Sequence, residues 1–276
     1  MSKAATSGGT AQERAAQLIQ AAHDLVDAER HGERLDLMTA RIAGLTRDEA
    51  YAIAQSAFAL KGEPVAGYKL GYTNQAIRVQ MNIFEPNFGR YGRSALVLPG
   101  DPPPPGLDRL VHPRIEPEIT VFLAHPLRGP AVTPAMAAAA IGTAHLSFEV
   151  VDTRYRSYQF TLCDNIADGS SGACCIVGES VDLDRLVAAD TATVTLLQGA
   201  DPLESSTITD LWSELCGNLA WLANKLAATD EELAAGSFVM TGALTRAHPA
   251  LRGQTYQARI SGLGTINHTF DWETLQ

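Results

Sequence analysis

The chain has 276 residues, of which 46% are hydrophobic and 19% charged, which is typical of one large packed domain or of a domain with an appendage. Its 21 Lys and Arg stand against 31 Asp and Glu, for a formal charge of −10, and this acidity argues against a nucleic-acid partner. No apolar run approaches the roughly 18 residues of a membrane-spanning helix, so we expect no membrane partner. The first ten residues lack the apolar core of a secretory signal, so we expect a cytoplasmic protein.

The first part of the chain is predicted to be helical. Residues 1–10 are small and polar and predict a flexible lead-in, whereas residues 11–62 predict an N-terminal helical region. Its first helix begins at Ala11, keeps apolar residues at three- and four-residue spacings, and ends near Gly32. A second helix begins after Thr46, because Thr46 and Glu49 match a capping box, and it ends at Gly62.

Residues 63–276 predict a mixed, mostly antiparallel β catalytic domain, because short apolar runs separated by Gly and Pro replace the helical spacing. Two helices are expected within it, at 134–141 and 215–228. Residues 99–105 contain five prolines and predict a loop, and residues 261–264 predict a hairpin turn. The predicted strands are 65–70, 115–124, 144–151, 174–177, 191–197, 238–241, 255–260 and 265–270.

The four cysteines, Cys163, Cys174, Cys175 and Cys216, show no C-x-x-C spacing. In a reducing compartment we expect small, mostly buried thiols rather than a zinc or redox site.

Two carboxylates share one face of a predicted strand. Side chains of a strand alternate between faces, so Glu116 and Glu118 lie together while Ile115 and Ile119 lie opposite. Like charges repel unless a positive group lies between them. The pair alone is more typical of an exposed edge with two solvated glutamates.

A third carboxylate changes that interpretation. On the next predicted strand, alternation places Phe148 and Val150 in the core and Glu149 on the opposite face. An acid within an apolar strand is costly to bury without a partner. Three strand-borne glutamates form an all-oxygen ligand set, which suits Mg²⁺ or Mn²⁺ better than zinc.

Other candidate residues carry weaker signals. Lys69 is flanked by Gly67 and Gly71, and glycines permit a close approach of the backbone to a ligand. The loop with Ser170 and Ser171 could hold a carboxylate through its hydroxyl and amide groups. His112 and His145 lie near the acidic strands, but we assign neither of them a catalytic role.

These segments together resemble the fumarylacetoacetate hydrolase superfamily, in order and approximate spacing. Within it, the chain is similar to the branch that holds 2-oxo-4-pentenoate hydratase and 4-oxalocrotonate decarboxylase, and the likeness runs from about residue 11 to residue 270. The segments that carry it are Gly67-Tyr-Lys-Leu-Gly-Tyr-Thr73, Ile115-Glu-Pro-Glu-Ile119, Glu149-Val-Val-Asp-Thr-Arg154, Ile166-Ala-Asp-Gly-Ser-Ser171, Leu219-Ala-Trp-Leu-Ala-Asn224 and Gly236-Ser-Phe-Val-Met-Thr-Gly242.

The resemblance implies an α+β fold with a mixed β-roll body, an N-terminal helical region and a homo-oligomer. It also implies Mg²⁺ or Mn²⁺ on Glu116, Glu118 and Glu149, a small 2-oxo acid as substrate, an active-site lysine at Lys69, and a serine at Ser171 that holds the substrate. The same segments suggest further substrate-binding residues: Leu70, Gly71, Asp168, Ser170 and Thr241.

The Glu-Pro-Glu sequence favours decarboxylation of a 2-oxo-3-enedioate, and hydration of 2-hydroxypenta-2,4-dienoate is the alternative. Three departures from the family pattern are Gly169 in place of asparagine, Cys163 in place of proline, and the pair Cys174–Cys175. Loss of the amide side chain at position 169 could change how the loop holds substrate.

Two other functions stay open at this point. The chain could be a non-catalytic partner subunit in a complex with a sister pathway enzyme, although a scaffold does not need the three glutamates and the lysine. A C–C hydrolase of the same superfamily is less favoured, because no histidine–glutamate pair to activate water is evident in the N-terminal region.

Overall fold

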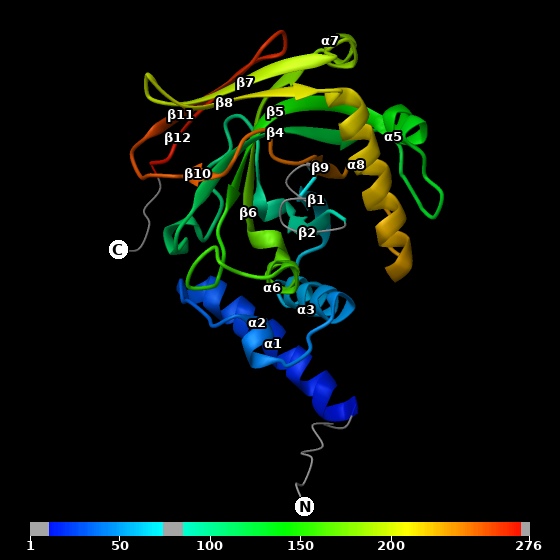
Figure 1. Cartoon of the computed structure of the whole chain (residues 1–276), viewed down its shortest axis with the longest axis vertical. Helices are drawn as coiled ribbons and strands as arrows, with labels where there is room; N and C mark the ends of the chain where they lie inside the picture. The colour runs from blue at the N-terminus through cyan, green and yellow to red at the C-terminus, as the bar shows by residue number, and fades with distance from the viewer. Residues whose placement is uncertain (1–10, 74–84, 272–276) are drawn as a thin grey trace, which may run out of the picture.

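The computed structural model describes residues 11–73 and 85–271, so the predicted lead-in of residues 1–10 lies outside the described residues. A curled eight-stranded sheet forms the centre of the molecule (Figure 1). A four-stranded sheet lies at one end, and the N-terminal helices lie at the other. No helix in the described ranges is long and apolar enough to cross a bilayer.

Three helices precede the first strand, namely α1 (Ala11–His31), α2 (Met38–Arg41) and α3 (Arg47–Ala59). The predicted capping box at α3 is confirmed, since the Thr46 hydroxyl accepts from the Glu49 amide and the Glu49 carboxylate accepts from the Thr46 amide. The apolar faces of α1 and α3 form a separate core with Tyr155 and Ile166. Ile166 belongs to α6 (Leu162–Ala167), so the helical region packs directly on the element that leads to Ser170 and Ser171.

The central sheet has the order β2-β1-β9-β4-β5-β6-β3, and β10 pairs with β4. The pairs β1–β9 and β3–β6 are parallel and the other pairs are antiparallel, so the prediction of a mixed sheet is confirmed. Its strands are β1 (Val65–Gly71), β2 (Asn87–Gly92), β3 (Leu96–Val97), β4 (Arg114–Leu123), β5 (Ile141–Val151), β6 (Gly172–Val181), β9 (Phe238–Met240) and β10 (His248–Pro249).

The second sheet is antiparallel with the order β12-β11-β7-β8. Its strands are β7 (Thr191–Gln198), β8 (Asp201–Thr209), β11 (Thr255–Ile260) and β12 (Gly264–Thr269). The predicted hairpin turn joins β11 to β12, and the proline-rich segment contains no helix or strand. The two helices expected in the body are present as α5 (Pro134–Ala140) and α8 (Leu211–Leu226), and α7 (Leu183–Val187) lies between β6 and β7. The 3₁₀ turns are η1 (Arg93–Ala95), η2 (Leu107–Arg109), η3 (Gly169–Ser171) and η4 (Ala227–Thr229).

Several elements were not predicted, for identifiable reasons. Strand β2 reads Asn-Phe-Gly-Arg-Tyr-Gly, and its two glycines hide the alternation. Strand β8 is an edge strand with mostly hydroxyl and acidic side chains and a proline, so it lacks an apolar pattern. Helix α6 has only six residues, yet Thr161 and Asp164 form a capping box before it that the sequence does carry. The short elements α2, α7, β3 and β10 also escaped prediction.

Candidate active site

Strand register brings the three glutamates together. Glu116 on β4 lies directly opposite Glu149 on β5, and Glu118 lies two residues further along the same face of β4. Ligand oxygens of the three carboxylates all lie within 4.8 Å of one another. Glu118 and Glu149 are 1% and 0% exposed, so the interpretation of the β4 pair as a solvated edge is wrong. Glu116 is partly exposed, on the side of the cluster that opens to a cavity.

Lys69 lies against this carboxylate cluster. Its Nζ lies 3.0 Å from Oε2 of Glu149 and donates a hydrogen bond of 3.1 Å to the carbonyl oxygen of Ser170. Burial alone would lower the pKa of Lys69, but the charges of the three glutamates raise it above its ordinary value. Lys69 is therefore a buried ammonium group at neutral pH.

The glycines around Lys69 leave room for neighbouring protein side chains. A Cβ at Gly67 would lie 2.4 Å from the ring of Phe238. A Cβ at Gly71 would lie 2.2 Å from Oδ1 of Asn87. Close packing of neighbouring protein side chains therefore requires glycine at these two positions, and Gly71 also lines the cavity described below.

One ammonium group does not balance three buried carboxylates. Burial raises the pKa of Glu116 to about 7, with Lys69 opposing the shift and Glu149 adding to it. Burial also raises the pKa of Glu118 well above its ordinary value, and the charges of Glu149 and Glu116 raise it further. Full ionisation of the cluster therefore requires additional positive charge.

The hydrogen bonds of the cluster leave room for a cation. Oε2 of Glu118 accepts from the amide of Gly242 at 3.0 Å, whereas its Oε1 is buried with no hydrogen-bond partner. Oε1 of Glu149 accepts from the hydroxyl of Tyr91 at 2.8 Å. Buried polar atoms are normally paired, so the bare oxygen of Glu118 among converging carboxylates fits a hard divalent cation.

A cavity of about 260 Å³ opens beside the cluster. Its polar lining includes Lys69, Glu116 and Ser171, and the rings of Tyr158 and Phe160 form apolar walls. Arg246, whose side chain is 79% exposed, lies at the rim and pairs with Glu204 at 3.2 Å. We call this space the active-site cavity.

The turn η3 supplies one side of the active-site cavity in an unusual backbone conformation. Gly169, Ser170 and Ser171 have consecutive φ values of 61°, 58° and 56°, a region that residues with a Cβ rarely adopt. Oγ of Ser171 accepts from the side-chain amide of Asn165 at 3.0 Å, and Oγ of Ser170 donates to Oδ1 of Asn87 at 3.1 Å. These bonds hold the two serines against the cavity.

The structure divides the other predicted substrate-binding residues into two groups. Leu70, Gly71 and Ser170 line the active-site cavity. Asp168 and Thr241 are not among its lining residues. The Thr241 hydroxyl donates to the carbonyl oxygen of Ile119 at 2.8 Å, so Thr241 ties β9 to β4.

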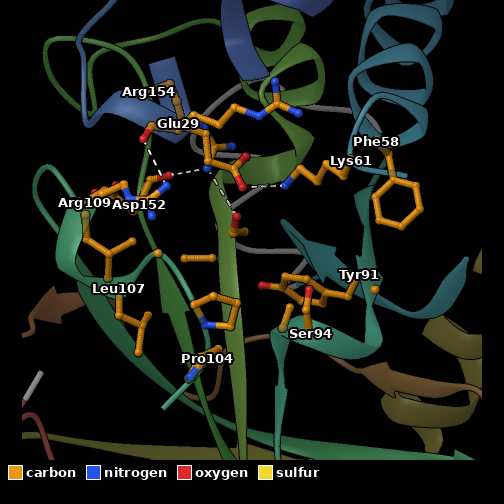
Figure 2. A pocket seen from close by; sticks show the side chains of 18 of the residues that line it. Glu29, Phe58, Lys61, Tyr91, Ser94, Pro104, Leu107, Arg109, Asp152 and Arg154 are labelled. Atoms are coloured by element: carbon orange, nitrogen blue, oxygen red, sulfur yellow. Dashed lines mark hydrogen bonds and ion pairs between the residues drawn. The ribbon is translucent and has the colours of Figure 1, made fainter. Parts of the chain in front are cut away.

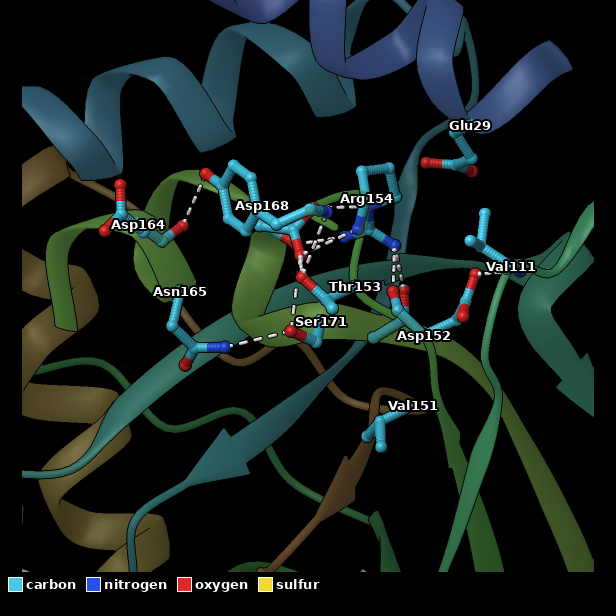
Figure 3. A network of polar contacts seen from close by, with 12 residues as sticks. Glu29, Val111, Val151, Asp152, Thr153, Arg154, Asp164, Asn165, Asp168 and Ser171 are labelled. Atoms are coloured by element: carbon cyan, nitrogen blue, oxygen red, sulfur yellow. Dashed lines mark hydrogen bonds and ion pairs between the residues drawn. The ribbon is translucent and has the colours of Figure 1, made fainter. Parts of the chain in front are cut away.

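Asp168 belongs to a buried polar network behind the turn (Figure 3). It forms an ion pair with Arg154 and accepts hydrogen bonds from the hydroxyls of Thr153, at 2.8 Å, and Ser171, at 3.2 Å. Asp168 thus holds the side chain of Ser171 in place through this hydrogen bond. Gly169 faces away from the active-site cavity, toward a small cavity shared with α1 and α3.

Histidines and cysteines near the site bind protein groups. A ring nitrogen of His112 lies 3.0 Å from the carbonyl oxygen of Thr153, and one of His145 lies 3.1 Å from that of Gly178. The four cysteines are free thiols, and burial raises the pKa of Cys174 and Cys175 on β6. The expectation of mostly buried thiols is confirmed.

Several side chains of the site were not predicted from the sequence, among them Asn87, Tyr91, Asn165 and Arg246. Asn87 and Tyr91 lie on the unpredicted strand β2, and Asn165 lies on the unpredicted helix α6. The capping box before α6 could have revealed Asn165. Nothing in the local sequence indicates that Arg246 reaches the cavity.

Comparison with known proteins defines the class of this fold and site. Residues 65–271 match the family described as fumarylacetoacetate (FAA) hydrolase C-terminal, so the chain belongs to the fumarylacetoacetate hydrolase family. The resemblance inferred from the motifs is confirmed.

Particular relatives narrow the likeness to one branch. The chain is 33% identical to 2-keto-4-pentenoate hydratase of Burkholderia vietnamiensis over 224 residues, covering 80% of this chain and 85% of that one. It is 29% identical to 4-oxalocrotonate decarboxylase of Pseudomonas putida over 263 residues, covering 92% and 97%. The structure of 4-oxalocrotonate decarboxylase from Pseudomonas putida G7, complexed with magnesium and adipate, superposes with a TM-score of 0.81 at 27% identity, covering 93% and 98%.

Proposed function

We propose that the chain is a divalent-metal-dependent lyase that decarboxylates a 2-oxo-3-enedioate, as a 4-oxalocrotonate decarboxylase does. The observation that carries the proposal is the convergence of three glutamates and Lys69 at one side of the active-site cavity. The relatives named as decarboxylases and hydratases support it, and so does the similar structure with magnesium and a dicarboxylate.

Glu116, Glu118 and Glu149 would hold the metal. Their all-oxygen donor set and the bare Oε1 of Glu118 suit Mg²⁺ or Mn²⁺. When bound, the metal supplies a Lewis acid for the 2-oxo oxygen of the substrate. The protein's own residues then bind, orient and exchange protons with the substrate.

We propose that Lys69 lies beside the substrate atom on which negative charge develops during the reaction. In a 2-oxo-3-enedioate, loss of CO₂ breaks the bond to the distal carboxylate, and the electron pair moves through the alkene to the 2-oxo oxygen. The product of this step is a dienolate. The buried ammonium group of Lys69 stabilises the new negative charge, or protonates it, in a site of low dielectric constant.

The turn η3 would orient the 2-oxo acid end of the substrate. Ser171 presents a hydroxyl that Asn165 and Asp168 fix from the protein side. Leu70, Gly71 and Ser170 complete this side of the active-site cavity and are proposed substrate contacts. We propose that Asp168 and Thr241 support the elements that line the cavity, because neither residue lines it.

Arg246 favours a substrate with two carboxylates. It lines the active-site cavity and its own side chain is 79% exposed, so a substrate carboxylate can compete with Glu204 for it. Tyr158 and Phe160 line the same cavity and provide apolar contacts for a carbon chain. This arrangement matches a dicarboxylic acid better than a monocarboxylic one.

Hydration of 2-hydroxypenta-2,4-dienoate is the second candidate. The observation that favours it is the 33% identity to a hydratase, against 29% for the decarboxylase of Pseudomonas putida. The same glutamates and Lys69 would serve it, with protonation of the carbon chain and addition of water in place of CO₂ loss.

We also propose a cytoplasmic homo-oligomer that can associate with a sister enzyme of its pathway. The support is the family membership and the soluble-protein composition of the chain. Light scattering of the purified protein tests the first part, and co-purification with the sister enzyme tests the second. A monodisperse monomer would contradict the homo-oligomer.

The function is tested by following 2-oxo-3-hexenedioate by ultraviolet absorbance and CO₂ release, with Mg²⁺ and with EDTA. Metal-dependent CO₂ release is the expected result. Consumption of 2-hydroxypenta-2,4-dienoate without CO₂ release from the enedioate would overturn the decarboxylase in favour of the hydratase. Inactivity on both compounds, with Mg²⁺ bound, would overturn both proposals.

A further inference from the structure

Tyr91 contacts the carboxylate cluster from the side opposite to the substrate. Its hydroxyl donates a hydrogen bond of 2.8 Å to Oε1 of Glu149, and the residue is only 4% exposed. Its ring stacks on Phe238, with centroids 6.0 Å apart and planes 17° apart. The phenol is therefore held in place by packing and cannot easily rotate away from Glu149.

The hydrogen bond from Tyr91 leaves the two oxygens of Glu149 with different partners. Oε1 is occupied by the phenol, whereas Oε2 faces Lys69 at 3.0 Å within the cluster. A carboxylate can otherwise turn about its terminal bond, because such torsions are broad. Groups that bind metal ligands from behind fix their orientation in this way.

The backbone of β6 makes room for the phenol. A Cβ at Gly172 would lie 2.7 Å from the hydroxyl oxygen of Tyr91, which is too close for a normal contact. Gly172 has an ordinary φ of −66°, so the need for glycine here comes from Tyr91 and not from the backbone conformation.

Tyr91 does not line the active-site cavity. Figure 2 shows it instead at the wall of a second cavity, of about 200 Å³, together with Phe58, Ser94 and Pro104. A substrate in the active-site cavity would therefore meet Glu116 and Lys69 without touching the phenol. Its effect on the reaction must pass through Glu149.

We propose that Tyr91 is a positioning residue for the metal, holding Glu149 in its metal-binding orientation. The inference rests on the proposed metal centre but not on which reaction occurs there. Removal of the hydroxyl is expected to weaken binding of Mg²⁺ about tenfold, the lower end of what such partners contribute.

The test is titration of the metal-free protein with Mg²⁺ by isothermal calorimetry, comparing the wild type with Tyr91→Phe. The matched control is Tyr68→Phe, which removes an equally buried phenol on the neighbouring strand whose hydroxyl bonds to Glu231, outside the cluster. We expect a tenfold higher dissociation constant for Tyr91→Phe and no change for Tyr68→Phe. At saturating Mg²⁺, kcat of Tyr91→Phe should return to within about threefold of the wild type.

Gly172→Ala provides a second variant that removes no polar group. Its methyl group should displace the Tyr91 hydroxyl and weaken Mg²⁺ binding, and this penalty should shrink in the Tyr91→Phe background. Unchanged Mg²⁺ binding in Tyr91→Phe would overturn the inference, as would equal weakening in Tyr68→Phe. Failure of the wild type itself to bind Mg²⁺ would instead overturn the proposed metal centre.

Discussion

Two clusters of buried charge lie on opposite sides of the turn η3, and they differ in how completely they are paired. In the network of Figure 3, Arg154 pairs with Asp168 and also donates to the carbonyl oxygens of Asp152 and Gly172. Both carboxylate oxygens of Asp152 accept backbone amides, from Val111 and His112. In the carboxylate cluster, three acids share one lysine, and Oε1 of Glu118 is bare.

The difference in pairing distinguishes buried charges that stabilise the fold from buried charges that remain available to bind a ligand. A buried ion pair with all its hydrogen bonds made holds the fold in one arrangement and has no capacity left for a ligand. A cluster with excess negative charge and an unpaired oxygen is costly to maintain in the folded protein, and a bound cation would remove that cost. The predictions below test this contrast.

The largest effect is expected at Glu118. Glu118→Gln should lower kcat/KM by about a thousandfold or more through loss of the metal. The metal-free variant should also melt at a higher temperature than the metal-free wild type, because one buried like charge is removed. Steady-state kinetics and calorimetry measure both quantities. A non-catalytic partner subunit would instead lose Mg²⁺ binding with no change in the activity of its complex.

The opposite stability change is expected at Asp168. Asp168→Asn removes the ion-pair partner of the buried Arg154, leaving only the more distant charges of Glu29 and Asp152, and should lower the free energy of unfolding by about 3 kcal/mol in urea titrations. The control is Asp36→Asn, which breaks an exposed pair with Arg156 and should leave the free energy of unfolding nearly unchanged. Equal losses in the two variants would contradict a structural role for the buried network.

Arg246→Ala tests whether a charged residue of the active-site cavity binds the substrate. We expect KM for the dicarboxylate to rise about tenfold, because we place Arg246 at the distal carboxylate. The value of kcat should not fall with it, because an ion pair with the carboxylate that leaves as CO₂ stabilises the substrate more than the transition state, whose charge moves to the 2-oxo oxygen. Arg259→Ala, on β11 of the second sheet, is the control. An equal rise in KM in both variants would show that Arg246 contributes only to general electrostatic attraction.

The excess negative charge also predicts a pH dependence. Glu116 must lose its proton to bind metal, and its pKa is about 7, so the dissociation constant for Mg²⁺ should rise at least about tenfold per unit as pH falls below 7, and more steeply where Glu118 also binds a proton. In the metal-free protein, a rise in pH has the opposite effect, because it lowers stability. The folded protein holds this proton above the ordinary pKa of 4.5, so stability should fall as pH rises from about 4.5 to 7. Calorimetric titrations and melting curves at several pH values measure both trends, and the metal-free Glu116→Gln variant should show a smaller fall in stability between pH 4.5 and 7.

The smallest effect is expected at Gly169, the departure from the family pattern. A Cβ there would meet nothing within 4 Å, and asparagine tolerates its φ of 61° better than most residues. Because Gly169 faces the α1–α3 side, Gly169→Asn should change KM by less than about twofold. A larger change in KM would show that position 169 does reach the substrate.

The carboxylate cluster was more predictable than the paired network around Arg154. Alternation along β4 and β5 is a local property, so the shared face of the glutamates follows from the sequence. The opposition of Glu116 and Glu149 depends on strand register, and the approach of Lys69 depends on β9 being inserted between β1 and β4. Such long-range pairings leave no local pattern in the sequence. The resemblance to a known family was what placed Lys69 and the glutamates in one site.

The unpredicted parts share a physical cause. Strand β2 and helix α6 are short and rich in polar or small residues, so they lack the periodicity that marks longer elements. Their side chains gain their roles from contacts across the fold, as Asn87 does with Asn165 at 2.7 Å. A strand with two glycines gives no sign that its tyrosine reaches a carboxylate 58 positions away.

The docking of the helical region on α6 makes it more than an appendage. Tyr155 and Ile166, at 0% and 1% exposed, are covered by the apolar faces of α1 and α3. A chain shortened to begin at residue 63 would leave this core open to water and would release the segment that holds the strained serines. Residues remote from any substrate therefore determine whether the catalytic loop keeps its shape, and heat should inactivate the enzyme as soon as the helices detach.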